Sequence, residues 1–168
     1  MLLIFGGLPA SGKSTISKGV ATEFNAVHVR VDTIEQTLKN EGFIEVYSEG
    51  YAIAYRIAAD NLSLGSTVVA DSVNPIGITR DASRLVGESA EVSVIEIEIV
   101  CSDPEEHRRR VETRNADIEG LVQPTWEQVL DREYEPWTKA QIVVDSAGES
   151  PGQTLKKTLS LIALESAN

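Results

Sequence analysis

The chain has 168 residues, with 15 lysine and arginine residues against 26 aspartate and glutamate residues, giving a formal net charge of −11. Its composition, 42% hydrophobic and 24% charged, is that of a globular protein, and its length supports one hydrophobic core. The acidic balance argues against nucleic-acid binding through a broad positive face, and no apolar run approaches the roughly 20 residues that span a bilayer. The single cysteine, Cys101, is typical of a reducing cytoplasm. We therefore expect one acidic cytoplasmic domain, either a monomer or a homodimer.

Short apolar runs alternate with helix-like segments, a pattern typical of an α/β fold with a parallel sheet. We expect strands at 2–5, 27–31, 67–70, 92–101 and 141–144. We expect helices at 13–24, 34–39, 50–64, 78–86 and 151–164, and two more that begin near 103 and 125. The run at 92–101 alternates apolar and polar residues, so we expect one face of that strand to be partly exposed. The sequence thus predicts a single domain over 1–168, with a mostly parallel five-stranded sheet in a three-layer fold.

A phosphate-binding motif follows the first expected strand. Residues 7–14, GLPASGKS, match G-x-x-x-x-G-K-[ST] at every required position, and a helix is expected directly after them. Glycines let successive backbone N–H groups face phosphate oxygens, and the helix adds the positive end of its dipole. Lys13 brings a charge to the β- and γ-phosphates, and the Ser14 hydroxyl can ligate Mg²⁺. We therefore expect ATP and Mg²⁺ as cofactors and these nucleotide-binding residues: Gly7, Pro9, Ala10, Ser11, Gly12, Lys13, Ser14 and Thr15.

Two carboxylates at strand ends are candidates for the chemistry at the γ-phosphate. Asp32 follows the second expected strand and Asp71 the third, at the sheet edge where ligands of open α/β folds gather. Either carboxylate could accept a proton from an attacking hydroxyl or hold Mg²⁺. The run Asp32-Thr33-Ile34-Glu35 also has the spacing of a helix cap with glutamate at its third position, which gives Asp32 an alternative, structural role.

These motifs resemble the P-loop kinases of small molecules. GLPASGKST at 7–15, Asp32 and VVADSVNP at 68–75 are similar to bacterial predicted kinases related to chloramphenicol phosphotransferase, the zeta toxins and the 5′-kinase domain of polynucleotide kinase. The resemblance covers most of the chain and implies an ATP-dependent transfer of the γ-phosphoryl group to a hydroxyl of a small molecule. It implies that Asp32 is the base that receives the acceptor's proton. It also implies that Asp71, with Asn74 nearby, assists the metal or the acceptor.

One position departs from that pattern. Many relatives that act on phosphorylated or nucleotide acceptors carry an arginine three residues after the first aspartate, where this chain has Glu35. An acid there would repel a phosphate, so the departure argues against a nucleotide or a nucleic-acid end as acceptor and slightly favours a neutral or cationic one. A nucleoside, nucleotide or polynucleotide 5′-kinase remains an enzymatic alternative. A nucleotide-dependent regulatory NTPase switch remains an alternative of another class.

Four arginines lie within seven positions at 108–114, a concentration that calls for an explanation in so acidic a chain. We expect Arg110 and Arg114, four residues apart, to share a helix face and to stabilise charge on the transferring phosphoryl group. The kinases resembled have lid arginines at this place, which implies a lid at about 110–124. Arg108 and Arg109 are expected in solvent or in salt bridges, and a wholly solvated, ion-paired face is the alternative for the cluster.

Weaker signals lie elsewhere in the chain. Gly148 follows the last expected strand, where related kinases often contact the adenine, so the resemblance implies that it neighbours the base. Arg80 and Arg84, one turn apart, either contact the acceptor or form a solvated helix face. Three aromatic residues either line an acceptor pocket or, as we favour, pack in the interior: Trp126, Tyr134 and Trp137.

Overall fold

A computed structural model describes residues 1–167. Its five strands are β1 (Leu2–Gly6), β2 (Val27–Arg30), β3 (Val68–Asp71), β4 (Val94–Val100) and β5 (Ile142–Asp145). They form one sheet in the order β2-β3-β1-β4-β5, and all four neighbouring pairs are parallel. The expected five-stranded α/β sheet is confirmed.

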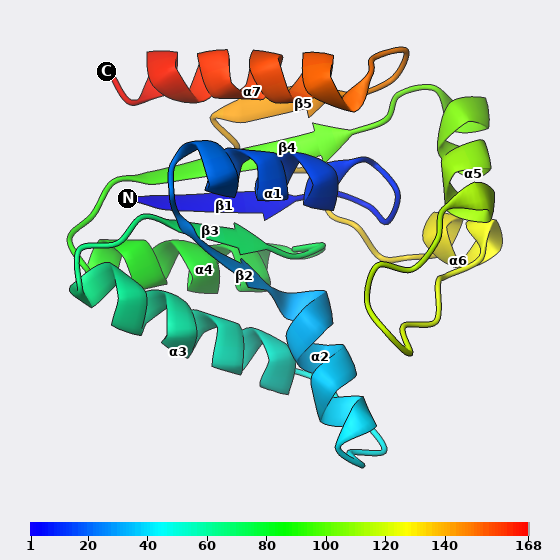
Figure 1. Cartoon of the computed structure of the whole chain (residues 1–168), viewed down its shortest axis with the longest axis horizontal. Coiled ribbons are helices and arrows are strands. Elements are labelled where there is room, and N and C mark those ends of the chain that lie inside the picture. Colours follow the sequence, from blue (N-terminus) through cyan, green and yellow to red (C-terminus); the bar gives the residue numbers. More distant parts are fainter. Residues whose placement is uncertain (168) are drawn as a thin grey trace.

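Residues 1–167 also form seven helices, of which the last follows β5: α1 (Lys13–Glu23), α2 (Val31–Asn40), α3 (Glu49–Ser63), α4 (Gly77–Ser89), α5 (Pro104–Thr113), α6 (Trp126–Leu130) and α7 (Pro151–Glu165). Helices α1 and α7 cover one face of the sheet, and α3 and α4 cover the other (Figure 1). Helices α5 and α6 lie beyond the carboxyl ends of the strands, together with the segment that joins them (Figure 1). Among residues 1–167, no helix combines the length and apolar character that crossing a membrane requires.

The central strand β1 is buried on both faces because helices cover both sides of the sheet. Its side chains alternate, so Leu3 and Phe5 pack in one cluster with Ile16 of α1. Leu2 and Ile4 pack in the second cluster, on the side of α3. This explains why β1 is a continuous apolar run instead of an alternating one.

Strand β4 has the partly exposed face that its alternating sequence predicts, except that Glu96 on this face is buried. Glu96 is only 2% exposed, and its carboxylate lies 2.5 Å from Nη2 of Arg84 on α4. On the same face of the strand, Glu98 accepts a hydrogen bond of 2.9 Å from the hydroxyl of Tyr134. Helix α4 and the segment after α6 cover only part of this face, and each glutamate has a partner there. Arg84 is therefore a structural partner of the sheet.

Arg80 contradicts both sequence-based interpretations, because it is buried and structural. Its guanidinium lies 5.4 Å from the ring centre of Tyr134 and 4.5 Å from that of Trp137. It donates hydrogen bonds to four backbone carbonyls: those of Asn74, Pro75, Glu135 and Pro136. Arg80 thus ties the segment that follows β3 to the segment that follows α6, and these two aromatic rings are half-buried against it.

Candidate functional site

The phosphate-binding loop connects β1 to α1 through backbone conformations that favour glycine. Gly7 has φ +145° and Gly12 has φ +98°. A Cβ atom on Gly7 would lie 2.3 Å from the carbonyl oxygen of Ile99, so no larger residue fits there. Gly12 precedes α1 and has no side chain with which to cap it, which leaves the first N–H groups of the helix to an anionic ligand.

Lys13 forms a buried ion pair with Asp71 at the end of β3. The side chains are 5% and 0% exposed, and Lys13 Nζ contacts one carboxylate oxygen of Asp71. The other oxygen accepts a hydrogen bond of 2.9 Å from Ser17 and lies 3.5 Å from Nε2 of His28. Burial alone would raise the pKa of Asp71, but Lys13 and His28 outweigh it and hold that pKa well below its ordinary range. In this arrangement both carboxylate oxygens of Asp71 have partners from the chain itself.

Asp32 lies inside α2 and is not its cap. Strand β2 ends at Arg30, which occupies the cap position without a side-chain bond, and Asp32 is in the first turn of the helix. The predicted capping role is therefore wrong. One carboxylate oxygen of Asp32 lies 3.8 Å from Nη2 of Arg30. The side chain remains 34% exposed and lines the same cavity as Lys13.

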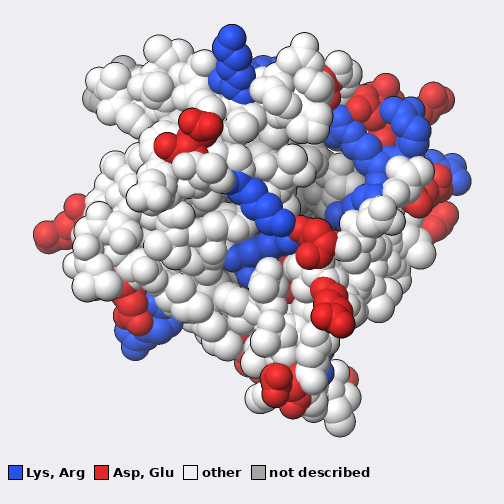
Figure 2. All heavy atoms as spheres, in the orientation of Figure 1, with Lys and Arg blue, Asp and Glu red and all other residues white. Residues whose placement is uncertain are grey.

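A cavity of about 630 Å³ unites most of the predicted site residues. Of those residues, its wall contains Pro9, Ala10, Gly12, Lys13, Ser14, Thr15, Asp32, Arg110 and Arg114. Figure 2 shows a hollow on this face of the molecule, with lysine and arginine side chains on both sides of it. Four predicted residues lie outside the wall: Gly7, Ser11, Asp71 and Gly148. The backbone of Gly148 instead donates a hydrogen bond to Glu106, next to Ser146 and Glu149, which do line the cavity.

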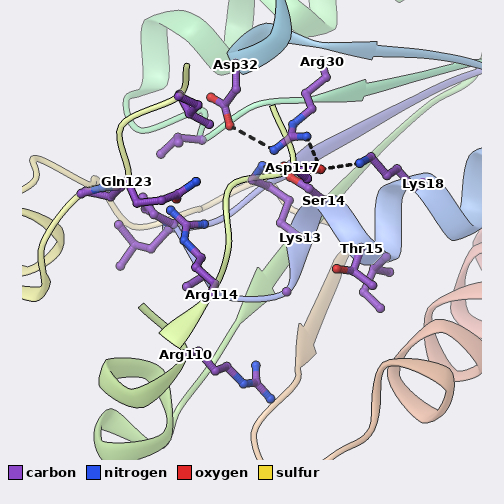
Figure 3. Close-up of a pocket in the computed structure, with 18 of the residues that line it drawn as sticks. Lys13, Ser14, Thr15, Lys18, Arg30, Asp32, Arg110, Arg114, Asp117 and Gln123 are labelled. Carbon is purple, nitrogen blue, oxygen red and sulfur yellow. Dashed lines mark hydrogen bonds and ion pairs between the residues drawn. The ribbon is translucent and has the colours of Figure 1, made fainter. Parts of the chain in front are cut away.

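The two predicted lid arginines point to different parts of the cavity (Figure 3). Arg110 donates hydrogen bonds to the hydroxyl and the carbonyl oxygen of Ser146, at 2.8 and 2.9 Å, and pairs with Glu106. Arg114 instead lies towards Gln123, and its buried Nε has no hydrogen-bond partner among residues 1–167. The separation arises because α5 ends at Thr113, so Arg114 is in extended backbone and the i,i+4 alignment is lost.

Sequence reasoning missed a cluster that connects the α5–α6 segment to the phosphate-binding side. The carboxylate of Asp117 lies 2.5 Å from Nζ of Lys18 on α1 and 2.7 Å from Nη1 of Arg30 (Figure 3). The hydrogen bond from Arg30 is the main reason that the pKa of Asp117 is held below its ordinary range. We call these three residues the Asp117 clasp. No local signal could reveal it, because 99 and 87 positions separate Asp117 from its two partners.

A family model described as an AAA domain matches residues 2–136, which is most of the chain. The chain belongs to this AAA-domain family. The phosphate-binding loop, Asp32 and the two arginines predicted to belong to a lid all lie within the matched residues. No curated protein matches the sequence.

Solved structures share the fold of this AAA-domain chain at low identity. A Mycobacterium tuberculosis APS kinase, in complex with AMPPNP and APS, aligns with a TM-score of 0.72 and 17% identity over 96% of both chains. A Sinorhizobium meliloti gluconokinase aligns with a TM-score of 0.68 and 15% identity, over 96% of this chain and 90% of its own. A sugar kinase from Janibacter aligns with a TM-score of 0.64 and 21% identity, over 96% and 94%. The fold is therefore that of P-loop kinases.

The side chains of the site suit a magnesium ion only if phosphates supply further ligands to it. Ser14 lines the cavity at the start of α1 and offers a hydroxyl ligand. Within residues 1–167, no group of three or more histidine, cysteine, aspartate or glutamate side chains could hold a metal. Mg²⁺ commonly keeps several waters and takes one or two protein ligands plus substrate phosphates, which this donor set fits.

Proposed function

We propose that the chain transfers the γ-phosphoryl group of ATP to a hydroxyl of a small molecule. The observation that carries the proposal is the shared cavity, whose wall contains the phosphate-binding loop, Lys13 and the carboxylate of Asp32. Its volume of about 630 Å³ lies in the range of small-molecule pockets. The family and the fold shared with P-loop kinases, one of them solved with AMPPNP, support a nucleotide as one ligand.

In this proposal the loop N–H groups and Lys13 bind the triphosphate, with Ser14 as a ligand of its magnesium ion. When bound, the ion neutralises charge on the β- and γ-phosphates. Lys13 leaves Asp71 to reach the phosphates, and this exchange releases a carboxylate oxygen of Asp71. The proposed role of Asp71 near the metal therefore depends on the movement of Lys13.

Asp32 is the proposed general base that accepts the proton of the attacking hydroxyl. Arg114 lies close enough for the charge of Asp32 to act on it, and we assign Arg114 to the transferring phosphoryl group. Arg110 is bound to Ser146, beside the loop where Gly148 is expected to neighbour the adenine. We therefore assign Arg110 to the bound nucleotide.

The sharpest test of this function replaces Asp32 by asparagine, which keeps the shape of the side chain but cannot take the proton. We expect Asp32→Asn to bind ATP with unchanged affinity and to lose acceptor phosphorylation by about a hundredfold or more, the usual contribution of a general base. ATP affinity and acceptor-dependent ADP release measure the two parts. Asp60→Asn, at an exposed position on α3 outside the cavity, is the matched control.

Full activity of the Asp32→Asn protein would remove Asp32 from the mechanism. ATP hydrolysis without any dependence on acceptors, in the wild-type protein, would instead favour the regulatory switch. Phosphorylation of DNA or RNA 5′ ends would favour the polynucleotide 5′-kinase.

A further inference from the structure

One face of α2 carries the proposed base and two further charged residues of the cavity wall. Asp32, Glu35 and Lys39 are spaced three and four residues apart, so they lie along one side of the helix, and all three line the cavity. A rise of 1.5 Å per residue places the Cα atoms of Asp32 and Lys39 about 10 Å apart along the axis. This face therefore forms one wall beside which an acceptor whose hydroxyl meets Asp32 has room to lie.

Three cations in the cavity wall form no ion pair within residues 1–167. The wall contains seven lysine and arginine residues: Lys13, Lys18, Arg30, Lys39, Arg110, Arg114 and Arg132. Four of them are paired with carboxylates: Lys13, Lys18, Arg30 and Arg110. Lys39, Arg114 and Arg132 are not. In a chain with eleven more acids than bases, three unpaired cations around one cavity indicate a site for negative charge.

Two of these cations, Lys39 and Arg132, share the cavity wall with Glu35. The charges of Lys39 and Arg132 both act on the carboxylate of Glu35. Burial is the main reason that the pKa of Glu35 is raised, and the charge of Asp32 raises it further. Along α2, Glu35 lies between the proposed base and Lys39, and Arg132 lines the same cavity.

This arrangement changes the expectation that Glu35 alone suggested. From the sequence alone, the acid at position 35 slightly favours a neutral or cationic acceptor molecule. In the structure, Lys39 follows one turn later on the same helix, and Arg132 reaches the cavity from the segment after α6. The stem of Glu35 packs so closely on α3 that a Cβ atom on Gly50 would lie 2.3 Å from its Cγ. Glu35 is thus held in place in the cavity wall.

We propose that the acceptor is a polyhydroxylated molecule with an anionic group, a carboxylate or a phosphate ester, at the end remote from the reacting hydroxyl, and that Lys39 and Arg132 bind this group. The proposal rests on the proposed phosphoryl transfer and specifies its substrate class. Glu35 receives intermediate hydroxyl groups, and Asp32 faces the hydroxyl that reacts.

A binding experiment tests the anionic subsite without turnover. The protein is saturated with AMPPNP and Mg²⁺, which fill the phosphate-binding loop, and is titrated calorimetrically with four probes that share one sugar ring. These are D-glucose, D-glucosamine, D-glucuronate and D-glucose 6-phosphate. We expect at least one of the two anions to bind roughly tenfold or more tightly than glucose, and glucosamine to bind most weakly. Which anion gains affinity distinguishes a carboxylate from a phosphate ester.

Variants identify the residues responsible for this preference. The double variant Lys39→Gln/Arg132→Gln should bind the preferred anion no better than glucose. The matched double variant Arg56→Gln/Lys156→Gln removes two exposed cations outside the cavity and should keep the preference. Equal binding of glucose and both anions by the wild-type protein would overturn the proposal. A preference that survives in the Lys39→Gln/Arg132→Gln protein would overturn it as well.

Turnover with ATP and the same four probes separates this proposal from the proposed function. Anion binding that depends on Lys39 and Arg132, without transfer to any hydroxyl, would support the subsite and count against the kinase. Transfer to glucose or glucosamine in preference to both anions would support the kinase and overturn the anionic subsite.

Discussion

At the scale of single residues, the site depends on the buried pair of Lys13 and Asp71. Both side chains are buried, so each charge is stabilised mainly by the other. Ser17 and His28 complete the partners of the carboxylate. A bound triphosphate would compete with Asp71 for Lys13. Nucleotide binding would therefore change the partners of the buried Asp71 carboxylate.

Replacing Asp71 by asparagine should destabilise the protein because it leaves the Lys13 charge buried without a partner. We expect a loss of about 3–5 kcal/mol in the free energy of unfolding, measured by urea denaturation at about pH 7. Bound ATP replaces the missing negative charge, so saturating ATP should stabilise Asp71→Asn more than the wild-type protein. An Asp71→Asn protein as stable as the Asp60→Asn control would contradict this account.

The difference in the free energy of unfolding between the wild-type protein and Asp71→Asn should also depend on pH. The folded-state pKa of Asp71 is lowered, so its stabilising contribution is fully present above the unfolded value of about 3.9 and is lost as the pH falls below it. The gap between wild type and Asp71→Asn should therefore narrow below about pH 4. A gap that widens on acidification would contradict the assignment of Lys13 and His28 as the groups that lower the pKa of Asp71.

At the scale of elements, the segment between α5 and α6 is held over the cavity by the Asp117 clasp. Asp117 contributes one carboxylate, while α1 and β2 contribute Lys18 and Arg30. Asp117 and Lys18 are about half exposed, so salt screens their contact more than it screens the buried pair at Lys13. Added salt should therefore weaken the attachment of residues 114–124 before it weakens the buried pair.

The variant Asp117→Asn should release this segment without unfolding the sheet. We expect faster amide hydrogen exchange confined largely to residues 114–124, because the segment loses its two charged contacts. Glu119→Gln, which removes an exposed acid from the same segment, is the matched control. Unchanged exchange in the Asp117→Asn protein would show that the clasp does not hold the segment.

An element can be predicted from the sequence when the residues that determine it are close together in the chain. The phosphate-binding loop could be predicted because its glycines, Lys13 and Ser14 are neighbours in the sequence. Arg80 could not, since its carbonyl partners include residues 135 and 136, which only the folded chain brings close. The divergence of Arg110 and Arg114 depends on the end of α5, and helix ends are the least certain feature of a sequence-based prediction.

At the scale of the whole molecule, the chain has a net charge of −11, yet the wall of its cavity carries more positive than negative side chains. The seven cations of that wall face four carboxylates, Asp32, Glu35, Asp117 and Glu149, a local balance of 7 − 4 = +3. This field attracts polyphosphates to the cavity while the rest of the surface repels them. The acidic composition that argues against broad nucleic-acid binding is thus compatible with a local anion site.

Salt should therefore act in opposite directions on nucleotide binding and on folding. Raising the ionic strength well above about 0.1 M, where the Debye length is about 10 Å, should weaken AMPPNP binding. The same change should slightly raise the thermal midpoint of the nucleotide-free protein, because it screens the repulsion among the surplus acids. Titrations and melting curves along one series of NaCl concentrations measure both effects, and AMPPNP affinity that rises with salt would contradict the positive cavity.

The central claim is that the γ-phosphoryl group of ATP is transferred to a hydroxyl of a small molecule. The most direct measurement is a ³¹P NMR time course of the wild-type protein with ATP, Mg²⁺ and the four sugar probes. We expect the γ-phosphate signal to be replaced by that of a new phosphate ester on the acceptor, together with ADP. Conversion of ATP to ADP and inorganic phosphate alone, at a rate that no probe changes, would contradict it.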